Sequence, residues 1–328
     1  MNFSFFLRLA AHTQLLLILE SGEETLVGGQ AVMEGVMMRS PHSYCVAVRK
    51  ADGQIVSEEA TLPRLSEKHR IFKWPVLRGI STLGQAMWLG MKALRFSANA
   101  ALDGLTGDGK HREKQQMKGW AIWANIIFSV AFFLFMYKFV PLYLATWLGH
   151  RIPGADGRLA INLIDGVIRI WIFLAFLVFI SRMKDIRRVF EYHGAEHKVV
   201  FNFESGQPVT VENAQRFVTW HPRCGTSFLL VVMVIAMAFY AFLPFDSFAL
   251  KFAARIALLP LIVGLSYELI RFAAKRRQGL MAVLTQPGLW LQRITTKPPS
   301  NDQAEVAIHA LDGAMALEKV QGGELVIA

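Results

Sequence analysis

Two histidines and a glutamate, in the pattern His193-x-x-Glu196-His197, have the types and the spacing of a metal site. On a helix, side chains four positions apart lie on the same face, so His193 and His197 can bind one ion. Glu196 is the neighbour of His197 and can act as a general base toward a water beside that ion. If this segment is helical, both histidines are the expected ligands and Glu196 the expected catalytic residue.

The pattern leaves the third ligand open among four candidates. Cys224 would complete a catalytic zinc site with three protein ligands and one open position. If His221 also binds the ion as a fourth ligand, the coordination shell is full and the zinc is structural. H-x-x-E-H is also the pattern of the inverzincin peptidases. Peptidases of this type use a downstream glutamate, which favours Glu204 or Glu268. The plain alternative is two solvated histidines beside a buried thiol.

The elements that must position these residues are unusually apolar. The chain has 328 residues, of which 53% are hydrophobic, with 24 phenylalanines and a mean hydropathy of +0.35. This is not the composition of an ordinary soluble protein. We interpret the net charge of +10 as attraction to the anionic lipids of a cytoplasmic leaflet and expect no nucleic-acid partner. The two cysteines indicate a reducing compartment, where a free thiol can bind zinc.

Four apolar runs predict an α-helical integral membrane protein with about four transmembrane helices, because about 20 apolar residues cross the hydrocarbon core. The runs are 120–148, 161–181, 225–245 and 252–270. Lys and Arg number eighteen in 95–119, 182–223 and 271–297 together, against three in 149–162 and 244–252. This excess places both termini and the metal-site segment on the cytoplasmic side of the inner membrane. The expected partners are membrane lipids and a protein or small-molecule substrate.

The rest of the chain is expected to be cytoplasmic. Residues between 27 and 62 alternate short apolar stretches with turns, which predicts a small antiparallel sheet. On that sheet Gln30, Glu34 and Arg39 are either surface residues or contributors to the metal site. We expect 1–26 to be an N-terminal extension and 27–62 to be the β-rich segment. Residues 63–119 are expected to form an amphipathic helix (75–105) and a charged linker, and 120–274 the four-span domain with the metal-site loop 182–224. Residues 275–328 are expected to form a cytoplasmic segment that ends in an amphipathic helix behind the capping-box pattern Ser300-x-x-Gln303.

Several segments together resemble the YqhQ-like family of bacterial membrane proteins. They are 28–39 (GGQAVMEGVMMR), 185–198 (DIRRVFEYHGAEHK), 221–228 (HPRCGTSF), 266–270 (SYELI) and 295–298 (TTKP). The likeness runs from about residue 27 to the C-terminal helix. It implies a multi-span membrane protein that is a predicted metal-dependent enzyme, with no assigned substrate.

Three functions fit these residues. The first is a membrane-embedded metal-dependent hydrolase at the cytoplasmic face, with a peptidase as the specific candidate and zinc as the expected metal. The second is a non-catalytic membrane scaffold with a structural zinc. The third is a transporter or channel with Glu268 and Arg169 in its path, although four spans are few for a transporter. An ionisable residue in a span is a functional candidate, and the plain alternative for Glu268 is a salt bridge with Arg271 or another loop cation.

Overall fold

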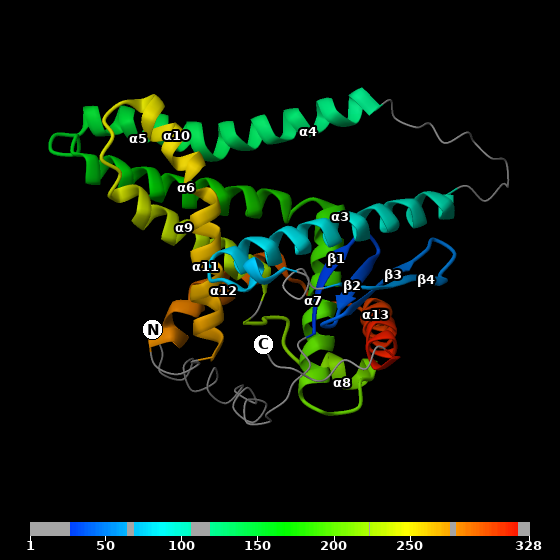
Figure 1. The fold of residues 1–328 in the computed structure, drawn as a ribbon. Helices are drawn as coiled ribbons and strands as arrows, with labels where there is room; N and C mark the ends of the chain where they lie inside the picture. Colours follow the sequence, from blue (N-terminus) through cyan, green and yellow to red (C-terminus); the bar gives the residue numbers. More distant parts are fainter. Residues whose placement is uncertain (1–26, 64–68, 106–118, 223, 276–279, 321–328) are drawn as a thin grey trace, which may run out of the picture.

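The structure, a computed structural model, describes residues 27–63, 69–105, 119–222, 224–275 and 280–320. It contains two groups of elements, a small sheet covered by helices and a set of long apolar helices (Figure 1). The predicted N-terminal extension 1–26 and most of the charged linker lie outside the described residues.

Four antiparallel strands form the sheet, in the order β1-β2-β3-β4. They are β1 (Gly28–Val32), β2 (Gly35–Arg39), β3 (Ser43–Arg49) and β4 (Ile55–Thr61). Successive side chains of a strand point to opposite faces. Met38 and Cys45 therefore lie in one apolar cluster, whereas Met37 and Tyr44 lie in another on the far side. The small antiparallel sheet predicted for 27–62 is confirmed.

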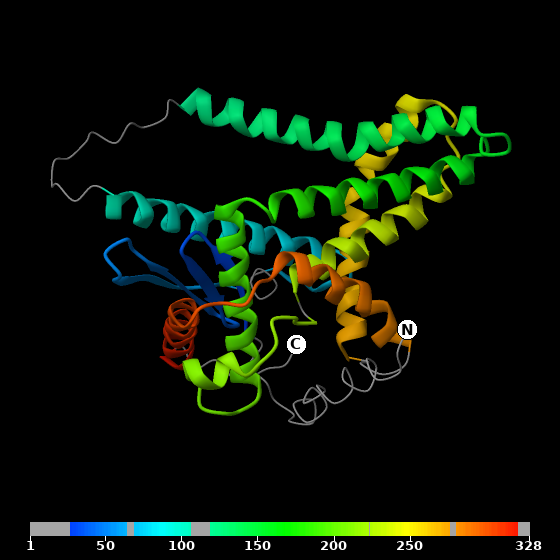
Figure 2. The ribbon, with the colours of Figure 1, turned by 180° about the vertical axis from the view of Figure 1, so that it is seen from behind.

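Helices cover both faces of this sheet. Helix α3 (Leu77–Leu105) packs Leu89 and Ala93 against the face that carries Met37. Helices α7 (Lys184–Glu204) and α13 (Asn301–Val320) pack on the opposite face, as Figures 1 and 2 show. Burial on both sides explains why β2 and β3 are almost continuously apolar instead of alternating with polar residues.

The last helix is capped at its N-terminus and is fastened to the sheet near its C-terminus. The predicted capping box is present, because Ser300 Oγ accepts from the Gln303 backbone N–H at 3.3 Å and Gln303 Oε1 accepts from the Ser300 N–H at 2.8 Å. Near the other end, the buried carboxylate of Glu318 accepts from Ser40 Oγ at 2.7 Å and from the backbone N–H of His42 at 2.8 Å. The contacts of Glu318 thus dock this helix on the sheet side of the molecule, at the turn between β2 and β3.

Two stretches are long and apolar enough to cross a membrane, Ile127–Arg151 and Arg158–Ile180. The first is built from α4 (Gly119–Leu134), the π-helical turn η3 (Phe135–Phe139) and α5 (Val140–Arg151). The second is α6 (Arg158–Ile180), which lies beside α5 as a helical hairpin (Figures 1 and 2). Pro141 is tolerated in the first stretch because it lies in the opening turn of α5.

The other two predicted spans are shorter or bent in the structure. Helix α9 (Gly225–Ala241) has 17 residues and ends before the predicted boundary at 245, because Pro244 disfavours a helical conformation for the residue before it. Helices α10 (Phe248–Ala257) and α11 (Leu259–Lys275) are bent by 47° and count as one span only if taken together. The described residues thus contain two candidate spans, or three with the bent pair.

The remaining elements of the described residues are short or connect the larger ones. They are the 3₁₀ turn η2 (Arg70–Lys73), α8 (Val211–Gln215) and α12 (Leu280–Thr295). Helix α12 packs against α9, and the chain then crosses α7 on its way to α13. At this crossing the backbone N–H of Lys297 donates to the Phe190 carbonyl at 2.9 Å. The crossing brings the end of α12 close to the two histidines of α7.

Candidate metal centre

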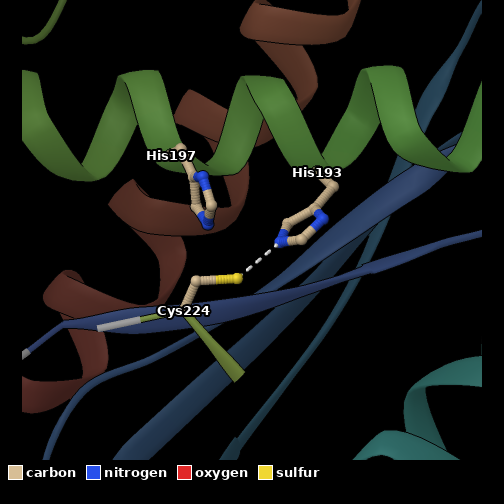
Figure 3. Close-up of side chains that lie close together, drawn as sticks. All are labelled: His193, His197 and Cys224. Atoms are coloured by element: carbon tan, nitrogen blue, oxygen red, sulfur yellow. Dashed lines mark hydrogen bonds between the residues drawn. The ribbon is translucent and has the colours of Figure 1, made fainter. Parts of the chain in front are cut away.

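The histidine pair lies on α7, so the segment expected as a metal-site loop is largely helical. His193 and His197 lie one turn apart on its surface, with ring centroids separated by 4.5 Å. Cys224 precedes the first residue of α9 and points at the same spot, with its Sγ 3.3 Å from His193 Nε2 (Figure 3). One potential ligand atom from each of the three residues lies within 4.8 Å of the other two.

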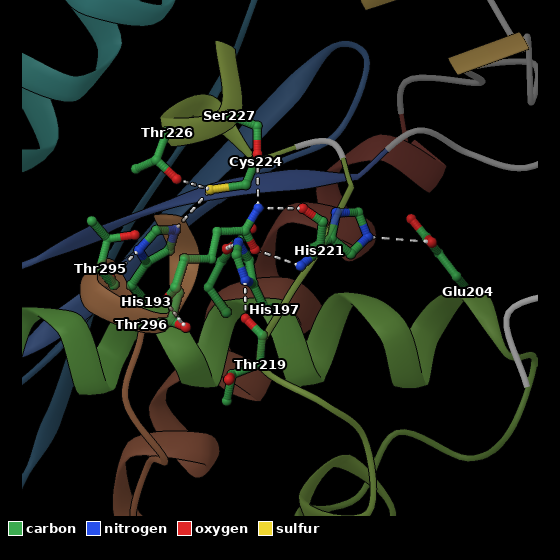
Figure 4. A network of polar contacts seen from close by, with 12 residues as sticks. His193, His197, Glu204, Thr219, His221, Cys224, Thr226, Ser227, Thr295 and Thr296 are labelled. Atoms are coloured by element: carbon green, nitrogen blue, oxygen red, sulfur yellow. Dashed lines mark hydrogen bonds and ion pairs between the residues drawn. The ribbon is translucent and has the colours of Figure 1, made fainter. Parts of the chain in front are cut away.

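Backbone carbonyls fix the orientation of both imidazoles. His193 Nδ1 lies 2.8 Å from the carbonyl of Thr295, at the end of α12, and His197 Nδ1 contacts the carbonyl of Thr219, between α8 and α9 (Figure 4). A carbonyl only accepts hydrogen bonds, so each Nδ1 carries the proton and donates it. Each Nε2 therefore keeps its lone pair, and metal-binding histidines are usually oriented in this way.

Burial favours the neutral form of His197, which is the form that binds metal. Its side chain is almost completely enclosed. Burial lowers the pKa of His197, although its interaction with Cys224 acts in the opposite direction. The ring is thus ready to donate a lone pair without first losing a proton.

The carboxylate of Glu196 faces the same spot as the histidines. Its Oε2 lies 3.4 Å from His197 Nε2, and the residue is only 6% exposed. Strand β1 holds it there, because a Cβ added at Gly29 would lie 2.6 Å from Glu196 Cγ. Two imidazole lone pairs, a sulfur and a carboxylate therefore converge in a buried place. Such a set suits a divalent cation with two nitrogen ligands and one sulfur ligand, with a base beside it.

His221 and Glu204, two other candidate ligands, form a separate buried pair beside this group. His221 Nε2 lies 3.6 Å from Glu204 Oε2, and its ring centroid is 5.6 Å from that of His197. Gln292 of α12 fixes the backbone of His221 on both sides, accepting from its N–H at 2.7 Å and donating to its carbonyl at 2.8 Å. The structure thus brings His221 and Glu204 next to the three-residue group without including them in it.

The expectation that Glu268 is a metal ligand is corrected by its position in the structure. Glu268 lies on α11 and forms a two-pronged salt bridge with Arg78 of α3, in which Arg78 Nε is 2.6 Å from Glu268 Oε1. The beginning of α3 packs closely on α11, since a Cβ added at Gly79 would lie 2.7 Å from Tyr267 Cβ. Among the described residues, the potential metal-binding group contains His193, His197 and Cys224 but not Glu268. The expected salt-bridge alternative is therefore the better interpretation, with Arg78 as the partner.

Two of the three polar residues singled out on the sheet, Gln30 and Glu34, have partners outside the site. Gln30 donates to the Ala86 carbonyl of α3 at 3.2 Å, and Glu34 forms a salt bridge with Arg188 of α7. The residue of this segment that reaches the site is Gly29, through its contact with Glu196. A glycine inside a strand often marks a close approach, and that signal could have identified it. Gln292 and the two carbonyls carry no comparable signal in the sequence.

Comparisons with known proteins agree with the resemblance noted in the sequence. Residues 74–317 match the model of a family described as a protein of unknown function (DUF1385). The chain is 36% identical over 303 residues to the uncharacterized protein YqhQ of Bacillus subtilis (strain 168). The aligned region covers 89% of this chain and 92% of that protein. No solved structure matches the chain.

Proposed function

The chain belongs to the YqhQ-like (DUF1385) family, and we propose that it is a membrane-embedded metal-dependent hydrolase with its site at the cytoplasmic face. The observation that carries this proposal is the convergence of His193, His197 and Cys224 with the carboxylate of Glu196 beside them. A catalytic zinc has three protein ligands, whereas a structural zinc usually has four. His221, which could be a fourth ligand, lies instead against Glu204, and this favours the catalytic alternative over the scaffold.

Zinc fits the donor set best. Two imidazole nitrogens and one thiolate are borderline-soft ligands, which suit zinc better than magnesium or calcium. When bound, a zinc ion would polarise the bond to be cleaved and acidify a water. His193 and His197 would hold it through Nε2, because their Nδ1 protons are committed to carbonyls.

Glu196 is the residue that we assign to proton transfer. Its Oε2 would take a proton from the attacking water as the water oxygen bonds to the substrate carbon. The same carboxyl would then return that proton to the leaving group as the scissile bond breaks. For a peptide substrate the leaving group is an amine, which needs this proton to depart. The low exposure of Glu196 keeps bulk water from competing for it.

We further propose insertion in the inner membrane with both termini in the cytoplasm, an orientation that rests on the excess of Lys and Arg in 95–119, 182–223 and 271–297. Several large apolar side chains of the two candidate spans face outward: Phe128, Phe132, Trp171 and Phe179 are each more than half exposed. Cysteine labelling from outside the membrane tests the orientation, because both native cysteines are buried. Asp156→Cys, in the turn after α5, should react, and Gln207→Cys, after α7, should not. Reaction at Gln207→Cys alone would reverse the assignment.

Glu196→Gln tests the catalytic role. The substitution keeps the size of the side chain but removes the base, and a general base contributes about 10²–10⁴ in rate. We expect normal zinc content, normal membrane insertion and loss of complementation in cells that lack the native protein. Glu191→Gln is the matched control, because Glu191 lies on the same helix and contacts Gln303, away from the site. Full complementation by Glu196→Gln would favour the scaffold instead.

A further inference from the structure

A second buried polar cluster lies among the apolar helices, away from the histidines. Lys138, Asp165, Arg169 and Arg255 are each at most 5% exposed. They come from η3, α6 and α10, and they surround Tyr240 of α9, which is completely buried. Figures 1 and 2 show these elements gathered at the end of the bundle that includes the turn between α5 and α6.

Positive charge is in excess in this cluster. Asp165 uses both of its oxygens, with Oδ2 2.7 Å from Arg169 Nη2 and Oδ1 2.8 Å from Arg255 Nη1. Guanidinium groups do not lose their charge in proteins, so one carboxylate faces two cations. Lys138 Nζ adds a third basic group 5.1 Å from the centroid of the Tyr240 ring, over which both guanidiniums also lie. Uncompensated charge is costly to bury.

Hydrogen-bond donors are in excess as well. Arg169 Nη1, Arg255 Nε and Asn162 Nδ2 are buried and have no hydrogen-bond partner among the residues that the structure describes. Asp165 Oδ1 and Arg255 Nη1 also lack a hydrogen bond, but these two atoms form an ion pair with each other. Asn162 is oriented by its own oxygen, which accepts from Arg255 Nη2 at 2.6 Å. A buried donor without an acceptor costs about 1–3 kcal/mol. Three such donors in one cluster call for an acceptor that carries several oxygens.

The backbone is also irregular at this place. Lys138 lies in the π-helical turn η3, and the Tyr137 carbonyl of the same turn accepts from Arg169 Nε at 3.2 Å. Single π-helical turns inside α-helices are frequent at functional sites. This turn directs both a lysine and a carbonyl to the cluster, which a regular helix would place differently.

We propose that this cluster binds an oxyanion of the phosphate class. Planar guanidinium forks match the oxygens of a phosphate, and a phosphate can accept from several donors at once. The negative charge of the phosphate would offset the positive charge of Arg169 and Arg255 that Asp165 alone does not neutralise. The surrounding helices expose large apolar side chains such as Trp171, so the phosphate of an anionic phospholipid is one source and free phosphate is the other. The proposal is independent of metal-dependent hydrolysis at α7.

Thermal unfolding of the full chain, purified in a non-ionic detergent, tests the proposal. The probes are phosphatidylglycerol, with diacylglycerol as the uncharged lipid control, and inorganic phosphate, with chloride at equal ionic strength. A ligand that binds only the folded protein raises the melting temperature. We expect phosphatidylglycerol or phosphate to raise it and both controls to leave it unchanged. A response to the lipid alone identifies the lipid as the source, and a response to inorganic phosphate identifies a soluble oxyanion.

Asn162→Asp separates ligand binding from folding. The new carboxylate would lie beside Arg255 and supply the missing negative charge from within the protein. We expect this variant to fold, to melt without ligand at or above the wild-type temperature, and to bind the probe at least about tenfold more weakly, as expected for the loss of charge-assisted hydrogen bonds.

Arg158→Gln is the control for this variant. Arg158 lies at the same end of the bundle, but it is exposed and pairs with Asp246. Its loss should leave the response to the probe unchanged. The proposal is overturned if the wild type responds to neither phosphatidylglycerol nor phosphate, or if Asn162→Asp responds as the wild type does.

Discussion

The two buried clusters contain groups of opposite character: electron-pair donors in one, and hydrogen-bond donors with positive charge in the other. The α7 cluster brings together the lone pairs of His193 and His197, the sulfur of Cys224 and the carboxylate of Glu196. The helical-bundle cluster brings together donors and positive charge around Tyr240. Both are enclosed by protein, where water cannot readily supply the missing partner. This difference is the reason that we propose a cation as the ligand of the first cluster and an anion as the ligand of the second.

A third buried group shows how a purely structural cluster differs from both. The carboxylate of Glu318 accepts from Ser40 and from the side chain and backbone of His42. Its acceptors and donors are matched within the fold, and they join α13 to the turn between β2 and β3. Burial of polar groups alone is thus not the mark of a ligand site, whereas an excess of one kind of group is.

Cys224→Ser should have the largest effect on the comparison. A serine hydroxyl stays protonated at neutral pH, so it cannot replace a thiolate ligand. We expect zinc in the purified protein to fall from about one ion per chain to near zero, with complementation lost as well. Cys45→Ala is the control, because burial raises the pKa of Cys45 to about 12 and keeps it a thiol against α13. Full zinc content in Cys224→Ser would remove the sulfur from the proposed ligand set.

Gly29→Ala should have the next largest effect. The added methyl group would lie 2.6 Å from Glu196 Cγ and 2.8 Å from the Met37 carbonyl, so the glutamate must move. A misplacement of about 1 Å can cost about 10²-fold in rate. We expect near-normal zinc content but complementation only at raised expression. Gly28→Ala has open space around its added Cβ and should behave as the wild type. Equal complementation by the two variants at matched expression would contradict the role given to β1.

Glu318→Gln should have the smallest effect and should leave zinc unchanged. Burial opposes ionisation of Glu318, but hydrogen bonds from Ser40 and His42 outweigh it and lower its pKa below the ordinary 4.5. A lowered pKa in the folded state stabilises the fold above the unfolded-state value, and this stabilisation is lost as the pH falls through the folded-state value.

Thermal unfolding of metal-free protein measures this effect without interference from metal binding at the proposed site. At pH 7 the variant should be less stable by about 1–3 kcal/mol, the usual contribution of hydrogen bonds to a charged group. The difference should shrink as the pH falls below about 4.5. A difference that stays constant with pH would show that the ionised carboxylate is not what joins α13 to the sheet.

Local patterns made much of the fold predictable. The four-residue spacing of His193 and His197 is a property of one helix, and the capping box at Ser300 is a property of one turn. The strand periodicity likewise needed only residues 27–62. The bundle was predicted less well, since the length of α9 depends on Pro244 and the span of α10 and α11 on a bend.

Contacts between distant segments were not predictable in the same way. Arg78 and Glu268 are 190 positions apart, and only the packing of α3 on α11 brings them together. The contact of Gly29 with Glu196 likewise depends on how β1 lies on α7. The ion pair of Asp165 with Arg255 joins α6 to α10, which the apolar runs could not reveal. Sequence spacing thus pointed to the two candidate ligands on one helix, whereas the supporting contacts required the fold.

Elemental analysis of the purified full chain is the most direct test of the cation site. Wild-type protein should carry about one zinc ion per chain, and His193→Ala should carry almost none, because losing one of three ligands opens the shell. His309→Ala, on the exposed side of α13, should keep the wild-type content and so control for nonspecific binding. Wild-type protein without a stoichiometric metal, or His193→Ala with as much metal as the wild type, would contradict the proposed metal centre.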